Sequence, residues 1–177
     1  MRPLISVFIA SSLDGFIARA DGSLDWLHAS AHRDEDYGYE AFVDGVDAFA
    51  MGRGTYDHIA HIDPLPFAGK PVFVFTHRAP ITPEGVTFWS LDPASAIARW
   101  TELGYARVYV DGGVLIDAFL RGGLIDELTI TVAPVLLGEG IPLFHAGIDQ
   151  RALRLEGLDS FPSGMAQLRY TIASTRE

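Results

Sequence analysis

Two glycine-rich turns contain the residues of this sequence that are best placed to hold an anionic ligand. FAMGRGTYD (49–57) and VYVDGGVLIDAF (108–119) each join an apolar run to a helix-like stretch. Glycines let backbone N–H groups approach a phosphate, and a helix N-terminus adds donors and partial positive charge. Neither turn matches the dinucleotide fingerprint G-x-G-x-x-G, since Asp57 stands where the third glycine of the first would fall. The two turns are predicted to hold two halves of a dinucleotide; tight strand-to-helix connections are the alternative.

A third turn, VFTHRAP (74–80), follows another apolar run. Its residues Thr76, His77 and Arg78 are candidates to bind a terminal phosphate, with help from Arg53 of the first turn. Arginine matches a phosphate group with a bidentate fork of N–H donors. Ordinary polar loop residues are the alternative interpretation.

Carboxylates cluster in the segment HRDEDYGYEAFVDGV (32–46). If this segment is a helix, Asp36 lies one turn before its buried stripe and Glu40 lies beside the stripe. An acid at such a buried edge is expected to have a raised pKa and to hydrogen-bond a ligand or deliver a proton. A solvated charged face is the alternative. The predicted stripe consists of Tyr39, Phe42, Val43 and Val46.

The composition excludes several classes of function. The chain has 177 residues, 49% of them hydrophobic, which predicts one globular domain over 1–177. Its net charge of −10 disfavours nucleic acid and anionic membranes. The absence of cysteine rules out disulfides and thiolate metal sites and is consistent with a reducing cytoplasm. The six histidines form no H-E-x-x-H motif, so no metal site is predicted.

Strand and helix patterns alternate along the chain. Continuous apolar runs are typical of strands covered on both faces, as in parallel sheets. Near the end, AQLRYTIAS (166–174) alternates apolar and polar residues, which predicts a final antiparallel hairpin. The pattern therefore indicates an α/β domain with a mostly parallel central sheet flanked by helices. The strands are expected at 4–10, 47–51, 71–76, 106–111 and 127–137, and helices at 93–104 and 112–123.

Four segments occur in the same order as in a known superfamily. They are ISVFIASSLDGFIARADGSLDW (5–26), MGRGTYD (51–57), VYVDGGVLIDAFL (108–120) and IDELTITVAPVLLGEGIPLF (125–144). With these motifs the chain resembles the dihydrofolate-reductase-like superfamily over roughly residues 4 to 173. It is most similar to the branch of the C-terminal reductase domain of bifunctional riboflavin-biosynthesis enzymes and its stand-alone bacterial relatives.

The resemblance implies a fold and a cofactor. It implies an eight-stranded, mostly parallel sheet that ends in an antiparallel hairpin, NADPH as hydride donor, and a homodimer. The turn of Thr76, His77 and Arg78 would read the adenosine 2′-phosphate. Ala10, Ile17 and the loop ARADGSLDW (18–26) would border the nicotinamide, with Trp26 matching the tryptophan at the end of that loop in the family. The implied phosphate contacts are Gly52, Arg53, Gly54 and Thr55 in one turn, and Asp111, Gly112, Gly113, Val114 and Leu115 in the other.

The resemblance also implies an activity. Reduction of a small heterocycle is expected, either pterin-like or ribosylaminopyrimidine-like, as in dihydrofolate reductase or 5-amino-6-(5-phosphoribosylamino)uracil reductase. Asp36 would orient or protonate the substrate ring, although Asp34, Glu35 and Glu40 remain alternatives. A non-catalytic NADP-binding or assembly module of the same fold is the competing hypothesis.

Overall fold

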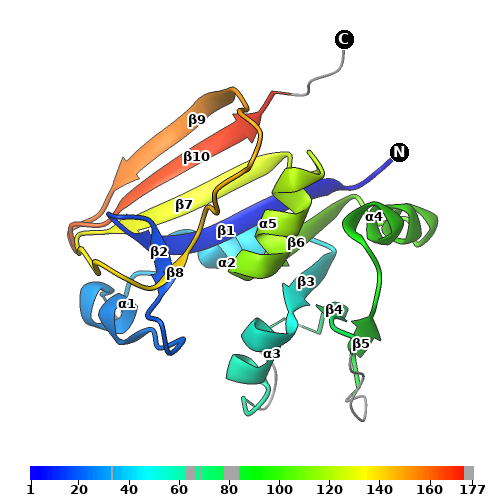
Figure 1. The fold of residues 1–177 in the computed structure, drawn as a ribbon, viewed down its shortest axis with the longest axis horizontal. Helices are drawn as coiled ribbons and strands as arrows, with labels where there is room; N and C mark the ends of the chain where they lie inside the picture. The colour runs from blue at the N-terminus through cyan, green and yellow to red at the C-terminus, as the bar shows by residue number, and fades with distance from the viewer. Residues whose placement is uncertain (33, 63–66, 68, 78–83, 174–177) are drawn as a thin grey trace.

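An eight-stranded sheet with the strand order β5-β4-β3-β6-β1-β7-β10-β9 organises the computed structural model (Figure 1). The structure describes residues 1–32, 34–62, 67, 69–77 and 84–173. All pairings from β5 across to β7 are parallel, and β10 pairs antiparallel with both β7 and β9. The strands are β1 (Leu4–Ser12), β3 (Ala48–Gly52), β4 (Val72–Phe75), β5 (Val86–Trp89), β6 (Arg107–Asp111), β7 (Glu127–Ala133), β9 (Leu153–Ser160) and β10 (Ala166–Ile172).

Helices cover both faces of the parallel part of the sheet. Helices α4 (Pro93–Glu102) and α5 (Gly113–Arg121) pack on one face, and α2 (Tyr39–Asp44) and α3 (Arg53–Ile59) pack on the other. In Figure 1, α5 lies in front of the sheet and α2 behind it. Two short strands, β2 (Phe16–Ala18) and β8 (Ile141–Pro142), form a separate antiparallel pair, and α1 (Asp25–Ser30) follows β2.

An aromatic layer joins α4 and α5 to the sheet. Trp100 of α4 and Phe119 of α5 are fully buried, and their rings stack with centroids 6.1 Å apart. Phe73 and Phe75, on β4, meet the same Trp100 ring from the sheet. Burial of such large rings is a main source of folding free energy, so this layer fixes the position of α5.

The smaller cluster on the other face surrounds Tyr109 of β6. Its ring contacts Phe42 of α2 and Phe49 of β3, with centroids 5.0 and 5.6 Å away. The Tyr109 hydroxyl donates to the backbone carbonyl of Phe8 over 2.6 Å. Residues Val43 and Val46 of the predicted stripe are buried in this region, as the spacing had indicated.

The main elements confirm the predicted α/β sheet and its final hairpin, with three differences. The strand expected over 127–137 ends at Ala133, because Pro134 lacks the N–H that a central strand requires. The helix expected within 32–46 begins only at Tyr39, after Gly38 in a left-handed conformation (φ 79°). Strand β5 and the β2–β8 pair were not foreseen. No helix among the described residues is long and apolar enough to cross a bilayer.

Strand β9 of the hairpin is an edge strand of the sheet and has an exposed apolar side. Leu153, Leu155 and Leu158 on β9 are all about half exposed or more. The homodimer implied by the resemblance stays a prediction, and this surface is where it would be sought.

Candidate functional site

The two glycine turns lie next to each other at one edge of the sheet. Strands β3 and β6 are parallel neighbours, with Met51 paired to Asp111, so the turns that follow the two strands lie at the same edge of the sheet. Gly112 has φ 90°, and a Cβ there would collide with Thr55 Oγ1 and lie 3.7 Å from the Gly52 nitrogen. Only glycine can occupy this position without moving the neighbouring turn.

A helix begins directly after each turn. Helix α3 follows Gly52 and α5 follows Gly112, and neither has a side-chain cap hydrogen bond at its N-terminus. By contrast, Asp92 caps α4 by accepting from the Ser95 backbone nitrogen. Backbone N–H groups in a first helical turn have no intrahelical acceptor, so uncapped N-termini are suited to bind an anion.

The side chains in these turns differ in accessibility. Val114 is 80% exposed, whereas Leu115 is only 6% exposed and packs in the core. Leu115 was expected among the phosphate contacts, but its side chain cannot take part and only its backbone is suitable. Arg53 forms an ion pair with Asp57 one turn further along α3, with Nε 2.7 Å from Oδ1. Gly54 is exposed, and nothing lies within 4 Å of the position that a Cβ would take there.

The third turn follows β4 and reaches toward the end of β5. The backbone nitrogen of Thr76 donates to the Trp89 carbonyl over 2.8 Å. His77 Nδ1 lies 2.8 Å from Ser90 Oγ, so the two turns after β4 and β5 are joined by a side-chain hydrogen bond. Arg78, the expected 2′-phosphate ligand, lies outside the described residues.

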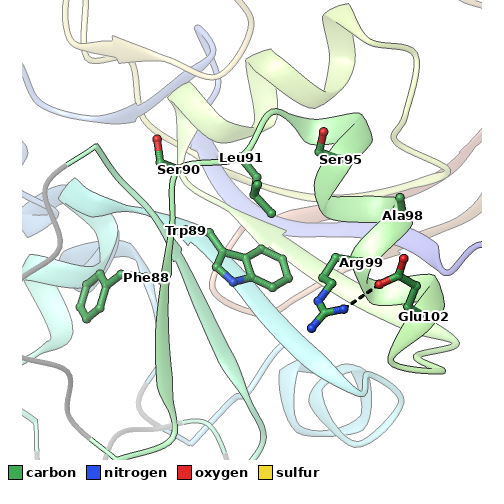
Figure 2. A pocket seen from close by; sticks show the side chains of 8 residues that line it. All are labelled: Phe88, Trp89, Ser90, Leu91, Ser95, Ala98, Arg99 and Glu102. Carbon is green, nitrogen blue, oxygen red and sulfur yellow. Dashed lines mark hydrogen bonds and ion pairs between the residues drawn. The ribbon is translucent and has the colours of Figure 1, made fainter.

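A surface pocket of about 470 Å³ lies between β5 and α4 (Figure 2). Trp89 and Phe88 point to opposite sides of β5, and the Trp89 ring faces Arg99 of α4, which is paired with Glu102. None of the lining residues comes from the two glycine turns. The pocket is therefore separate from the turns that are suited to hold phosphates, although Ser90 connects it to His77.

A carboxyl group with a raised pKa lies between the glycine turns and the aromatic cluster. Although Asp111 as a residue is partly exposed, its carboxyl group is enclosed, and this burial raises its pKa to about 6. A hydrogen bond of 2.8 Å from the Gly112 nitrogen acts in the opposite direction. The pKa of nearby Tyr39 is raised to about 12 by burial and by the Asp111 charge. A carboxyl group with such a pKa can hold a proton near neutral pH.

Asp36, the acid favoured from the sequence, has the opposite environment. It is exposed, and its carboxylate accepts hydrogen bonds of 3.0 Å from the backbone nitrogens of Gly38 and Glu40. These bonds lower its pKa, with the Gly38 contact as the larger cause. The expected raised pKa of Asp36 is therefore wrong, because its carboxylate is bound to the chain that leads into α2 instead of lying on a buried edge.

The residues expected near the nicotinamide come from three separate elements. Trp26 on α1 is 4% exposed, and its Nε1 has no hydrogen-bond partner among the described residues. Ala10 lies on β1 beside Thr131 of β7. Ile17 lies on β2, where its Cδ1 would be 2.9 Å from a Cβ added at Gly113. A buried donor without an acceptor is one that a bound water or ligand could satisfy.

The raised pKa of Asp111 is the main property that the sequence interpretation missed. Asp111 was assigned only to the cofactor turn, yet it ends the apolar run RVYVD (107–111). A carboxylate that ends a strand covered on both faces is desolvated, and this signal was available in the sequence. In the part of the chain that the structure describes, no three His, Asp or Glu side chains gather as metal ligands.

Comparison with known proteins gives a consistent set of relatives. The family model of the RibD C-terminal domain matches residues 3–167. Protein YwjB of Bacillus subtilis (strain 168) is 39% identical over 170 residues, covering 94% of this chain and 97% of YwjB. The riboflavin biosynthesis protein RibD of Corynebacterium ammoniagenes is 31% identical over 156 residues, which cover 79% of this chain but 45% of RibD.

A solved structure is similar over its whole length. The crystal structure of a Shewanella sp. PV-4 protein, described as a riboflavin biosynthesis protein, superimposes with a TM-score of 0.88 at 36% identity. The match covers 98% of this chain and 99% of that one. The sheet order and the antiparallel C-terminal hairpin are thus those of a known group of folded proteins.

Replacement of Gly112 by alanine tests the contact between the two turns. Because φ is 90° and the added Cβ meets Thr55 Oγ1, Gly112→Ala should lower the free energy of unfolding by about 1–3 kcal/mol or more in urea denaturation. Adding Thr55→Ala should restore part of that loss. Gly54→Ala is the matched control, since nothing lies within 4 Å of its Cβ position, and it should be neutral or stabilising. Equal losses in both glycine variants would contradict the described contact.

The raised pKa of Asp111 predicts how stability depends on pH. The folded protein binds the proton more tightly than the unfolded chain, so stability should fall as pH rises from about 4 to about 6 and then level off. Asp111→Asn retains an oxygen acceptor for the Gly112 nitrogen and removes this titration. The variant should therefore gain stability over wild type across that window, by at most about 3 kcal/mol. Parallel pH profiles of wild type and variant in urea denaturation would show that Asp111 titrates normally.

Proposed function

The chain belongs to the RibD C-terminal domain family, and from this membership we propose that it is an NADPH-dependent reductase of a small heterocycle. The family is reductase-like, and the fold is dihydrofolate-reductase-like, as the sequence motifs predicted. The proposed substrate is a pterin-like or ribosylaminopyrimidine-like ring. The observation that carries the proposal is the contact between the two glycine turns, each of which leads into an uncapped helix.

The residues present fit a dinucleotide. Two helix N-termini on adjacent strands offer backbone donors for a pyrophosphate, and glycine at position 112 lets the two turns lie close together. We propose that Gly52, Arg53, Gly54 and Thr55 hold one side of the phosphates, and that Gly112, Gly113 and Val114 hold the other. When bound, NADPH supplies a hydride for transfer to carbon.

The preference for NADPH over NADH is assigned to the third turn. Thr76 and His77 lie at the end of β4, the strand next to β3, and therefore one strand outward from the first glycine turn. We propose that these residues and Arg78 contact the 2′-phosphate, and that Arg53 lies close to the same phosphate. Arg53 carries a guanidinium fork suited to a phosphate.

The proton for the reaction is assigned to Asp111. Reduction of a C=N bond adds a hydride to carbon and a proton to nitrogen, and the proton must come from a group that holds one near neutral pH. Asp111 has that property, because burial raises its pKa to about 6. After transfer, the carboxylate takes a proton back from water. Trp26 Nε1, a buried donor without a partner among the described residues, would orient the ring through a hydrogen bond or a water.

Asp36 keeps a role in substrate orientation in this proposal. Its low pKa makes it a hydrogen-bond acceptor and not a proton donor. The competing hypothesis is a non-catalytic NADP-binding or assembly module, in which the cofactor site is retained and no substrate is reduced. The carboxyl group of Asp111 favours the enzyme, since an assembly module would have no need of a carboxyl group with a raised pKa.

Nucleotide titration tests the proposed cofactor. Quenching of tryptophan fluorescence should report tight binding of NADPH and at least about tenfold weaker binding of NADH, a difference of about 1.4 kcal/mol. The chain has three tryptophans, one of them at the proposed nicotinamide end. If neither nucleotide binds at millimolar concentration, the glycine turns are only strand-to-helix connections and the proposed function fails.

Turnover in carboxylate variants separates the two hypotheses. Once a pterin or pyrimidine is found that consumes NADPH, Asp111→Asn should lower kcat by about 100-fold or more, the usual contribution of a general acid. Its NADPH affinity should stay within a few fold of wild type. Asp36→Asn should mainly raise the KM for the ring. Unchanged kcat in Asp111→Asn would remove Asp111 from the reaction. An assembly module would consume no NADPH with any ring tested.

A further inference from the structure

The carboxylate of Asp14 joins two loops that are more than 120 residues apart in the sequence. Its Oδ1 accepts from Ser12 Oγ at 2.6 Å and from the Leu137 nitrogen at 3.1 Å, and its Oδ2 accepts from the Gly138 nitrogen at 2.7 Å. Ser12 Oγ in turn accepts from the Phe16 nitrogen at 2.9 Å. The turn after β1 and the loop after β7 are therefore held together by one charged group.

Backbone hydrogen bonds extend this connection into a small structural unit. The Leu13 nitrogen donates to the Val135 carbonyl, and the Leu143 nitrogen donates to the Gly15 carbonyl, each over 2.9 Å. Strands β2 and β8 pair within the same region. We call this unit, residues 13–18 with 134–143, the flap.

The flap packs directly on the N-terminus of α5. A Cβ at Gly113 would lie 2.9 Å from Ile17 Cδ1 and 3.5 Å from the Pro142 carbonyl oxygen, so both strands of the flap touch this first helical residue. Gly113 is itself one of the residues proposed to hold the pyrophosphate. A shift of the flap would therefore open the site next to this residue.

We propose that Asp14 is a positioning residue, whose carboxylate holds the flap closed against the α5 N-terminus and thereby sets the affinity for the nicotinamide half of the cofactor. The inference rests on the proposed function, because it assumes a dinucleotide in the glycine turns. Asp14 is proposed to act through the flap, because its carboxylate binds Ser12, Leu137 and Gly138 of the two loops.

The carboxylate is needed in its charged form. The Ser12 hydrogen bond and those from Gly138 and Leu137 lower the pKa of Asp14 to about 2, so it is ionised at any pH used for an assay. Two backbone nitrogens point at two different oxygens of this group. An asparagine offers one oxygen and one NH₂ group, so Asp14→Asn must leave at least one of those donors without its acceptor.

Two measurements on Asp14→Asn test the proposal. Amide hydrogen exchange of the protein without nucleotide should be faster at Leu137 and Gly138 than in wild type. NADPH should bind roughly tenfold more weakly, as expected if the closed flap falls to about a tenth of the population. Adenosine 2′,5′-bisphosphate, which lacks the nicotinamide half, should bind as in wild type. Glu156→Gln is the matched control: it also neutralises an exposed, hydrogen-bonded carboxylate, but on β9, and should change neither measurement.

Each outcome decides a different point. Equal weakening for NADPH and the bisphosphate would show general loss of structure and overturn the positioning role. Unchanged NADPH binding would also overturn it, while the proposed function would stand. If wild type binds neither nucleotide, the proposed function fails and the positioning role fails with it. In that case, unaltered exchange at Leu137 and Gly138 would further show that Asp14 does not hold the loop.

Discussion

The close approach of the β3–α3 turn to the β6–α5 turn is the constraint on which the rest of the site depends. Gly112 lies against Thr55, and a single added carbon atom would push the two turns apart. This contact places two helix N-termini side by side at one edge of the sheet. Two partial positive charges and two sets of backbone donors then lie where a pyrophosphate is proposed to bind.

Aromatic packing in the core fixes the positions of the strands and helices that carry these two turns. Stacking of Trp100 on Phe119 attaches α5 to α4, and Phe75 attaches both to β4. On the opposite face, the Tyr109 ring packs between α2 and β3. Strand β6 is therefore enclosed on both faces, and the last residue of that strand, Asp111, inherits a desolvated carboxyl group. The same packing that positions the turns thus raises the pKa of the proposed proton donor.

Asp14, Asp36 and Asp111 show how the environment gives chemically identical groups different pKa values. Asp14 accepts hydrogen bonds from the Ser12 hydroxyl and from backbone nitrogens, and Asp36 accepts them from backbone nitrogens. These hydrogen bonds lower the pKa of both carboxyl groups. Asp111 has one such bond and a desolvated setting, which raises its pKa. Hydrogen-bond donors favour the charged form and burial favours the neutral form, so carboxylates of the same chemistry can serve the different roles proposed for Asp14 and Asp111.

The sequence by itself determined the α/β class, the glycine turns and the antiparallel hairpin, because apolar periodicity and glycine placement are local signals. It could not assign the acid, since the periodicity that favoured Asp36 says nothing about which hydrogen bonds its carboxylate makes. It also could not show that Asp14 meets Gly138, or that Gly112 meets Thr55. Those contacts join segments far apart in the chain, and only the packing of the sheet and its helices decides them.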